Sequence, residues 1–253
     1  MKQKQTNILP FSHLGGSFAF TLAEVLITLA VIGIVAALTI PTLVNAYQEI
    51  ALVSALKKNY SIFSQAVLKW QSDNSCTEDI KDCMSSYAGW DCENGFNDAF
   101  KDEIKIVARG NRSETAGLDW LPDDTTLFDG SQAAIGQFAV SKNASHSDAV
   151  CHFLLTDGAT FSLSFNDFGN KYGLIAVDVN GKKRPNRIGK DTFFIGLIGK
   201  GLTPYFGYEY GGYEGGQCNS YNNSSCNPND GLSPTAYVLT HDKLPNTKAL
   251  FGN

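Results

Sequence analysis

The sequence predicts an α+β fold in which one long N-terminal helix packs against a small antiparallel sheet. Three observations support this fold class. A helical pattern of apolar residues extends over roughly the first seventy residues, short alternating segments follow in the second half, and turn-forming residues separate them. The chain has 253 residues, of which 43% are apolar and 18% charged, so it can bury a folded core.

The helix begins as an apolar segment that is long enough to cross a bilayer. From Phe20 to Val44 the only charged residue is Glu24, and a helix of this length spans roughly 37 Å against about 30 Å of hydrocarbon. Residues 1–19 contain two lysines and no acid, whereas the chain after the segment is acidic. This asymmetry predicts a cytoplasmic leader (1–19), a transmembrane helix half (20–44) and the remaining chain outside the cytoplasm.

A secretory signal peptide and a plain membrane anchor are the simpler explanations of this segment. Signal peptides have a shorter apolar region, of about 7 to 15 residues. A plain anchor explains the length but not Glu24, because a carboxylate inside a bilayer is costly and needs a partner. A cut before Phe20 would create an α-amino group one helical turn from Glu24, which could pair with it within one copy or between neighbouring copies.

The pattern Phe-Thr-Leu-x-Glu followed by an apolar stretch resembles the type III signal of type IV prepilins and type II secretion pseudopilins. The resemblance implies cleavage between Ala19 and Phe20, N-methylation of Phe20 and assembly through Glu24. Gly33 and Pro41 stand where that family places Gly and Pro. The family usually has Gly before the cut, so Ala19 predicts slower or variant processing.

The resemblance implies a structural protein and not an enzyme: a subunit of a type IV pilus or of a type II secretion filament. Its partners would be other pilin subunits, the prepilin peptidase, the inner-membrane assembly platform and the membrane. It would cross the bacterial inner membrane once and later stand in a periplasmic or extracellular filament. Whether it is a major pilin, a minor pilin or a pseudopilin stays open. The alternative is a membrane-anchored extracellular binding module that does not polymerise.

Beyond the apolar run the helix is predicted to continue to about Gln71, with a kink at Pro41 and an amphipathic half at residues 45–72. Residues 73–253 are expected to form the extracytoplasmic globular domain, which the family resemblance makes pilin-like. Its first part reads as a loop-rich connector with a short helix near residues 97–108. Strands are expected in a hairpin around Thr156–Ala159, at 173–179, at 192–198 and near 236–241.

Residues 178–194, which connect the strands expected at 173–179 and 192–198, are rich in turn-forming residues. Its Asp-x-Asn-Gly, Pro-Asn and Gly-x-Asp-x-Phe groups resemble a segment common in pseudopilin-like proteins, although Arg184 stands where that segment has Gly. A structural turn is the favoured interpretation and no cofactor is expected. The alternative is a calcium site with Asp178, Asn180 and Asp191 as oxygen ligands, at a spacing unlike an EF-hand loop.

Six cysteines all lie on the outer side of the apolar run, where an exported domain would be oxidised. They are predicted to form disulfides, and the spacing leaves the pairing open, with short local loops favoured. A zinc site is disfavoured because no Cys-x-x-Cys pair is present, and the one histidine next to a cysteine would face away from it on a strand. The disulfide candidates are Cys76, Cys83, Cys92, Cys151, Cys218 and Cys226.

Charge and motifs exclude several function classes. The net charge is −5, and we predict no nucleic-acid partner from charge. Hydrolase, nucleotide-binding and zinc-protease motifs are missing from the sequence, and the four histidines are scattered. The Tyr-rich and Gly-rich segment 205–231 is expected to be a surface loop, with an adhesive surface as the alternative.

Overall fold

The computed structural model describes residues 20–76, 103–111, 117–126, 142, 150–164, 173–198, 201–204 and 235–245. The chain divides into two compact units, Met1–Ala46 and Tyr47–Asn253. The first unit contains the start of helix α1. The second contains the rest of α1, a sheet of six strands and the short helix α4.

Helix α1 covers Leu22–Asp73, within two residues of the predicted bounds at each end. It continues through Pro41, and the kink expected there stays a prediction. The helix ends where Ser75 adopts a left-handed backbone with φ 54° and the Cys76 N–H donates to the Gln71 carbonyl at 2.8 Å. This pairing satisfies one of the carbonyls that every helix C-terminus leaves open.

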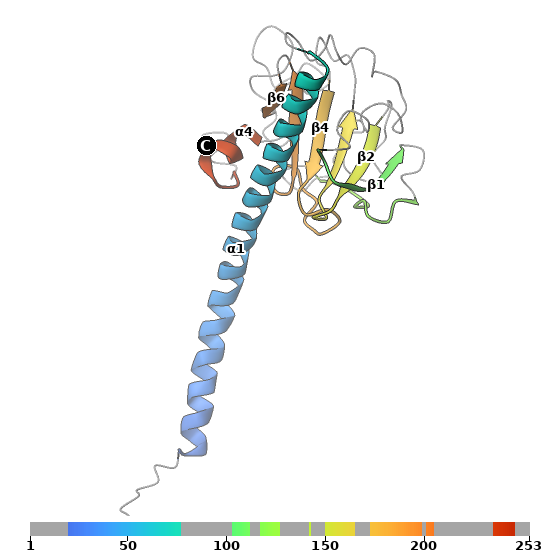
Figure 1. Ribbon diagram of the computed structural model, residues 1–253. Helices are drawn as coiled ribbons and strands as arrows, with labels where there is room; N and C mark the ends of the chain where they lie inside the picture. Colours follow the sequence, from blue (N-terminus) through green and yellow to red (C-terminus); the bar gives the residue numbers. More distant parts are fainter. Residues whose placement is uncertain are drawn as a thin grey trace, which may run out of the picture. The chain divides into compact units, whose positions relative to one another are not determined.

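The sheet is an antiparallel meander in which the strands follow one another in sequence order (Figure 1). Each strand therefore hydrogen-bonds to its neighbour along the chain, and no crossover connection is needed. The strands are β1 (Ile106–Asn111), β2 (Val150–Leu155), β3 (Thr160–Ser164), β4 (Gly173–Asp178), β5 (Thr192–Ile198) and β6 (Gly201–Pro204).

The predicted hairpin and the two predicted strands that follow it are confirmed. In the β2–β3 turn Gly158 has φ 88°, and the Ala159 N–H donates to Asp157 Oδ1 at 3.1 Å. The Asp-Gly pair therefore supplies the turn that the sequence indicated. The α+β class of long helix and antiparallel sheet is confirmed as well.

Two local predictions are wrong. The C-terminal part of the helix expected near 97–108 is strand β1, where side-chain exposure alternates from Ile106 to Gly110 as it does on a half-buried strand. The strand expected near 236–241 is helix α4, Thr235–His241. Its β-branched and aromatic residues favour a strand locally, but one helical turn brings the Tyr237 and His241 rings into a stack while Val238 enters the core.

The core of the second unit lies between α1 and one face of the sheet. Apolar residues of α1 at helical spacing, among them Leu56, Phe63 and Trp70, are buried together with alternate residues of β2 to β5. Phe63 packs edge-on against Phe161 with ring centroids 5.0 Å apart, and Phe161 stacks on Phe153 at 4.6 Å. The predicted amphipathic half of the helix thus buries Phe63 and Trp70 in the core.

The opposite face of the sheet is buried too, but it is more polar. Thr160, Asp178 and Thr192 are direct neighbours across β3, β4 and β5, and all three are fully buried. The next row contains His152 beside Ser162, with His152 Nδ1 2.6 Å from Ser162 Oγ. Cross-strand pairing therefore joins His152 to Ser162 on this buried face, whereas the Thr160 hydroxyl has no hydrogen-bond partner among the described residues.

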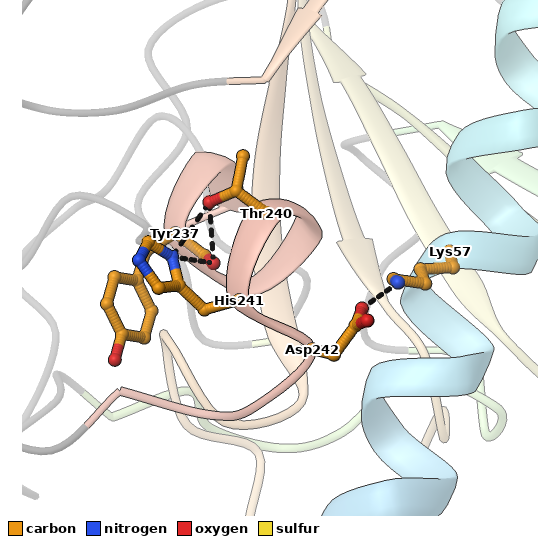
Figure 2. A network of polar contacts seen from close by, with 5 residues as sticks. All are labelled: Lys57, Tyr237, Thr240, His241 and Asp242. Atoms are coloured by element: carbon orange, nitrogen blue, oxygen red, sulfur yellow. Dashed lines mark hydrogen bonds and ion pairs between the residues drawn. The ribbon is translucent and has the colours of Figure 1, made fainter.

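Ion pairs and hydrogen bonds attach α1 to the elements around it. Lys58 pairs with Asp157 in the β2–β3 turn at 2.9 Å, and Lys69 pairs with Glu103 at 2.6 Å. Figure 2 shows Lys57 pairing with Asp242, the residue directly after α4. The Leu244 N–H donates to Glu49 Oε1 at 3.0 Å, so the segment after α4 is bound to α1 at two points.

We expect Phe63→Ala to lower the free energy of unfolding of the second unit by about 3–5 kcal/mol, because it removes a fully buried ring and its contact with Phe161. The matched control is Leu68→Ala on the same helix, whose side chain is 58% exposed and whose loss should cost about 0.5 kcal/mol or less. Urea unfolding of the detergent-solubilised full chain, followed by tryptophan fluorescence, measures both. Equal losses for the two variants would contradict this account of the core.

Candidate functional site

The head of α1 is closed by a reciprocal pair of contacts between Thr21 and Glu24. The Thr21 N–H and hydroxyl donate to Glu24 Oε2 at 2.8 and 2.9 Å, and the Glu24 N–H donates to Thr21 Oγ1 at 3.2 Å. This is a capping box, in which the residue before the helix and the third helical residue satisfy each other's backbone donors. The sequence reasoning missed the role of Thr21, although Thr-x-x-Glu before an apolar run is its signature.

The capping box gives Glu24 a partner within the uncleaved chain. The predicted partner was the new amine that cleavage before Phe20 would create. Phe20 lies outside the helix and is 82% exposed, while Ala19 lies outside the described residues. The carboxylate is therefore already bound by two donors of Thr21, and an amine would have to share it or replace one of them.

The first part of α1 presents an apolar surface that its own unit does not cover. All its side chains from Leu22 to Val44 are exposed except Ala36, which is half-buried. The hydroxyls of Thr28, Thr39 and Thr42 donate to carbonyls three or four residues earlier in the helix, so these groups need no water. Within the described residues α1 alone is long and apolar enough to cross a membrane.

Gly33 and Pro41 both lie inside this exposed stretch of α1. A Cβ atom added at Gly33 would meet nothing within 4 Å, so no contact among the described residues requires a glycine there. A mid-helix glycine costs about 1 kcal/mol relative to alanine. Pro41 cannot donate a backbone hydrogen bond, and the adjacent Thr42 hydroxyl donates to the Leu38 and Thr39 carbonyls at 3.3 and 2.9 Å.

The second candidate site is the loop between β4 and β5, where the calcium ligands were predicted. The structure brings Asp178 and Asp191 into one loop with both side chains fully buried, and Asn180 half-buried beside them. Asp178 Oδ1 accepts the Asn180 N–H at 3.2 Å. The two oxygens of Asp191 accept the N–H groups of Asn186 at 2.8 Å and Arg187 at 2.6 Å.

These contacts are those of a structural turn, because each carboxylate satisfies the backbone of its own loop. Asn186 has a left-handed backbone with φ 47°, and Asp191 binds its N–H. In the part of the chain that the structure describes, no three acidic, histidine or cysteine side chains gather as a metal centre. The calcium site stays a prediction.

Burial changes the acidity of both carboxyl groups. It raises the pKa of Asp178 well above its ordinary value of 3.8, and the charge of Asp191 raises it further, against the opposing N–H groups of Asn180 and Gly181. Burial likewise raises the pKa of Asp191, against the N–H groups of Arg187 and Asn186. Ionising these acids therefore costs free energy in the folded state.

The cysteines and histidines form no catalytic pair in the described residues. Cys151 lies on the core side of β2 and His152 on the opposite side, next to Ser162, as the alternation of a strand requires. Cys76 and Cys151 are both disulfide-bonded, so neither offers a free thiol. The other four cysteines and the Tyr-rich segment 205–231 lie outside the described residues, and the pairing of the six stays a prediction.

No family model, curated protein or solved structure matches the chain. The assignment of a function therefore rests on the residues described above.

We expect the raised pKa of Asp178 to appear as a pH dependence of stability. The folded state holds the Asp178 proton more tightly than the unfolded chain does, so this group stabilises the fold most below about pH 4 and loses that contribution as the pH rises through the folded-state pKa. Asp178→Asn does not ionise, so its stability relative to the wild type should rise with pH by up to about 1.4 kcal/mol per pH unit. Urea unfolding from pH 4 to pH 8 measures this.

The control for this measurement is Asp119→Asn, because the Asp119 side chain is 96% exposed. It should leave the pH profile of the wild type unchanged. If the free energies of unfolding of the wild type and of Asp178→Asn change with pH in parallel, the pKa of Asp178 is not raised in the folded state.

A separate measurement addresses calcium. If the loop is a structural turn, the midpoint of thermal unfolding should be the same in millimolar calcium and in excess EGTA. A midpoint that rises with calcium in the wild type and not in Asp191→Asn would establish a calcium site instead.

Proposed function

We propose that the protein is a structural subunit, a prepilin or pseudopilin, of a type IV pilus or type II secretion filament. In this proposal it is inserted through α1, cleaved before Phe20, N-methylated there and assembled through its apolar helix. The globular unit with α1 against a small antiparallel sheet would then be a pilin-like domain outside the cytoplasm. Its partners would be other subunits, the prepilin peptidase, the assembly platform and the membrane.

The observation that carries the proposal is the exposed apolar half of α1 with a carboxylate held in its first turn. A helix of this composition needs lipid or other helices around it. Glu24 lies in the first turn, where it caps the helix together with Thr21, and it is the one charged residue from Phe20 to Val44. Lipid is a poor environment for a carboxylate, and an amine of a neighbouring helix is a better partner than a threonine hydroxyl.

Gly33 supports the same proposal. A side chain at this position would contact none of the described residues. No contact within the chain therefore explains why the helix carries a glycine, which costs helix stability. Small residues on apolar helices allow the backbones of neighbouring helices to approach closely. A filament core built from parallel copies of α1 would supply such neighbours.

The processing step is tested by mass spectrometry of the N-terminus of the protein isolated from its native membrane. We expect a chain that begins at N-methylated Phe20. An intact Met1, or a cut after Ala37, would contradict the proposal. The intact chain would favour the alternative of a membrane-anchored binding module that does not polymerise.

The assembly step is tested by substitutions at the head of α1. Glu24→Ala and Glu24→Gln should both insert into the membrane, and both should reduce incorporation into sheared filaments about tenfold or more, because the pair with the amine needs the charge. Glu24→Gln keeps an oxygen that can accept a hydrogen bond from Thr21. Normal assembly of this variant would therefore show that Glu24 acts only as a helix cap.

Thr39→Val is the matched control, since the Thr39 hydroxyl bonds only to the Val35 carbonyl of its own helix at 2.9 Å. It should insert and assemble as the wild type does. Normal filament yield from Glu24→Ala would overturn the proposed role of Glu24.

A further inference from the structure

The loop between β4 and β5 concentrates positive charge in an otherwise acidic chain. Of the nine residues from Lys182 to Lys190, five are basic and none is acidic. Without these five, the chain has fifteen Lys and Arg against 25 Asp and Glu, a net charge of −10. We call residues 182–190 the basic loop; its cations are Lys182, Lys183, Arg184, Arg187 and Lys190.

Among the described residues, the cations of the basic loop form no ion pair, whereas four other lysines do. Lys57, Lys58, Lys69 and Lys142 each lie within 4 Å of a carboxylate. No cation of the basic loop forms such a pair with a described residue, and Lys182 Nζ instead donates to the Asp119 carbonyl at 3.0 Å. The side chains of Lys182, Lys183 and Arg184 are exposed.

The two aspartates that flank the loop in the sequence face inward. Asp178 and Asp191 are fully buried, and they bind backbone N–H groups at the two ends of the turn. Of the five cations, Lys182, Lys183 and Arg184 are exposed, whereas Arg187 and Lys190 are half-buried.

The backbone of the loop is fixed by contacts on two sides. The Thr126 N–H donates to the Asn186 carbonyl at 2.9 Å, and the Ile188 N–H donates to the Thr126 carbonyl at 3.0 Å. At the start of the loop Gly181 has φ 64°, and a Cβ atom there would lie 2.2 Å from the Gly158 carbonyl oxygen. A loop held in this way loses little backbone freedom when it binds.

We propose that the basic loop binds an acidic surface of a second copy of this chain and so orients neighbouring subunits. The proposal rests on the proposed function, because it requires copies to assemble. Every copy carries both signs of charge, a compact group of five cations and a net −10 elsewhere, which suits a head-to-tail contact between unlike surfaces. The net charge of −10 on the rest of the chain would repel a nucleic acid or an anionic lipid surface.

The test compares the triple variant Lys182→Glu, Lys183→Glu and Arg184→Glu with a control of equal charge change, Lys105→Glu, Arg109→Glu and Lys243→Glu. All six side chains are exposed. Light scattering follows self-association of the purified full chain when detergent is diluted, at about 0.05 and 0.5 M salt.

We expect the loop variant to associate about tenfold more slowly than the wild type at low salt, and the difference to vanish at high salt, because steering by exposed charge is screened. The control should follow the wild type. Equal slowing of both variants, or a wild-type rate that does not depend on salt, would overturn the proposal.

A milder variant controls for loss of folding by removing the three charges without adding acids: Lys182→Gln, Lys183→Gln and Arg184→Gln. We expect it to associate at an intermediate rate and to keep the unfolding midpoint of the wild type. If wild type and loop variants assemble alike, the loop proposal falls and the filament proposal stands. If the wild type does not assemble at all, both fall.

A final arm asks whether the partner is a polyanion. Fluorescence anisotropy with a labelled DNA duplex at physiological salt should show no binding by the wild type. Binding that the loop variant loses would replace the second copy with nucleic acid as the partner.

Discussion

The exposed apolar surface of α1 before residue 45 is the constraint on which the rest of the structure depends. Fourteen large apolar side chains from Phe20 to Val44 are exposed in the single chain. Burying each of them contributes about 1.5–3 kcal/mol, so on the order of tens of kcal/mol is left unrealised until lipid or other helices cover the segment. No folded subunit could carry this surface in water, and the few polar groups of the segment are arranged accordingly. The threonines bond to their own helix, and Glu24 and Thr21 satisfy each other.

The same helix has a different task after residue 47. There its apolar residues form a stripe that covers one face of the sheet, with Phe63 and Trp70 in the core. Ion pairs of Lys58 and Lys69 connect the helix to Asp157 in the β2–β3 turn and to Glu103, which precedes β1. One continuous helix thus combines a surface that other molecules must cover with a surface that its own sheet covers.

The β4–β5 loop shows how burial and exposure divide within a single segment. Its two aspartates are buried, and burial raises the pKa of both. Their carboxyl groups accept hydrogen bonds from four backbone N–H groups and so fix the turn. Of its five cations, Lys182, Lys183 and Arg184 are exposed, whereas Arg187 and Lys190 are half-buried. A rigid backbone with exposed charge is suited to recognition, and this is why we propose a partner for the loop.

The sequence by itself determined α1, the Asp-Gly hairpin and strands β4 and β5, because these depend on periodicity, on turn chemistry and on unbroken apolar runs. It also singled out Glu24, Asp178 and Asp191 as residues of interest. It missed β1 and the four-residue strand β6, and it gave α4 the wrong type, because short segments take their conformation from the surfaces they pack on.

Only the tertiary structure decided what the singled-out residues do within the subunit. It paired Glu24 with Thr21, and it showed that the buried Asp178 and Asp191 accept backbone N–H groups of their own loop. It also left Lys182, Lys183 and Arg184 exposed between these two buried acids. Hydrogen-bond geometry and burial depend on where the chain returns in space, and composition and spacing along the chain do not contain that information.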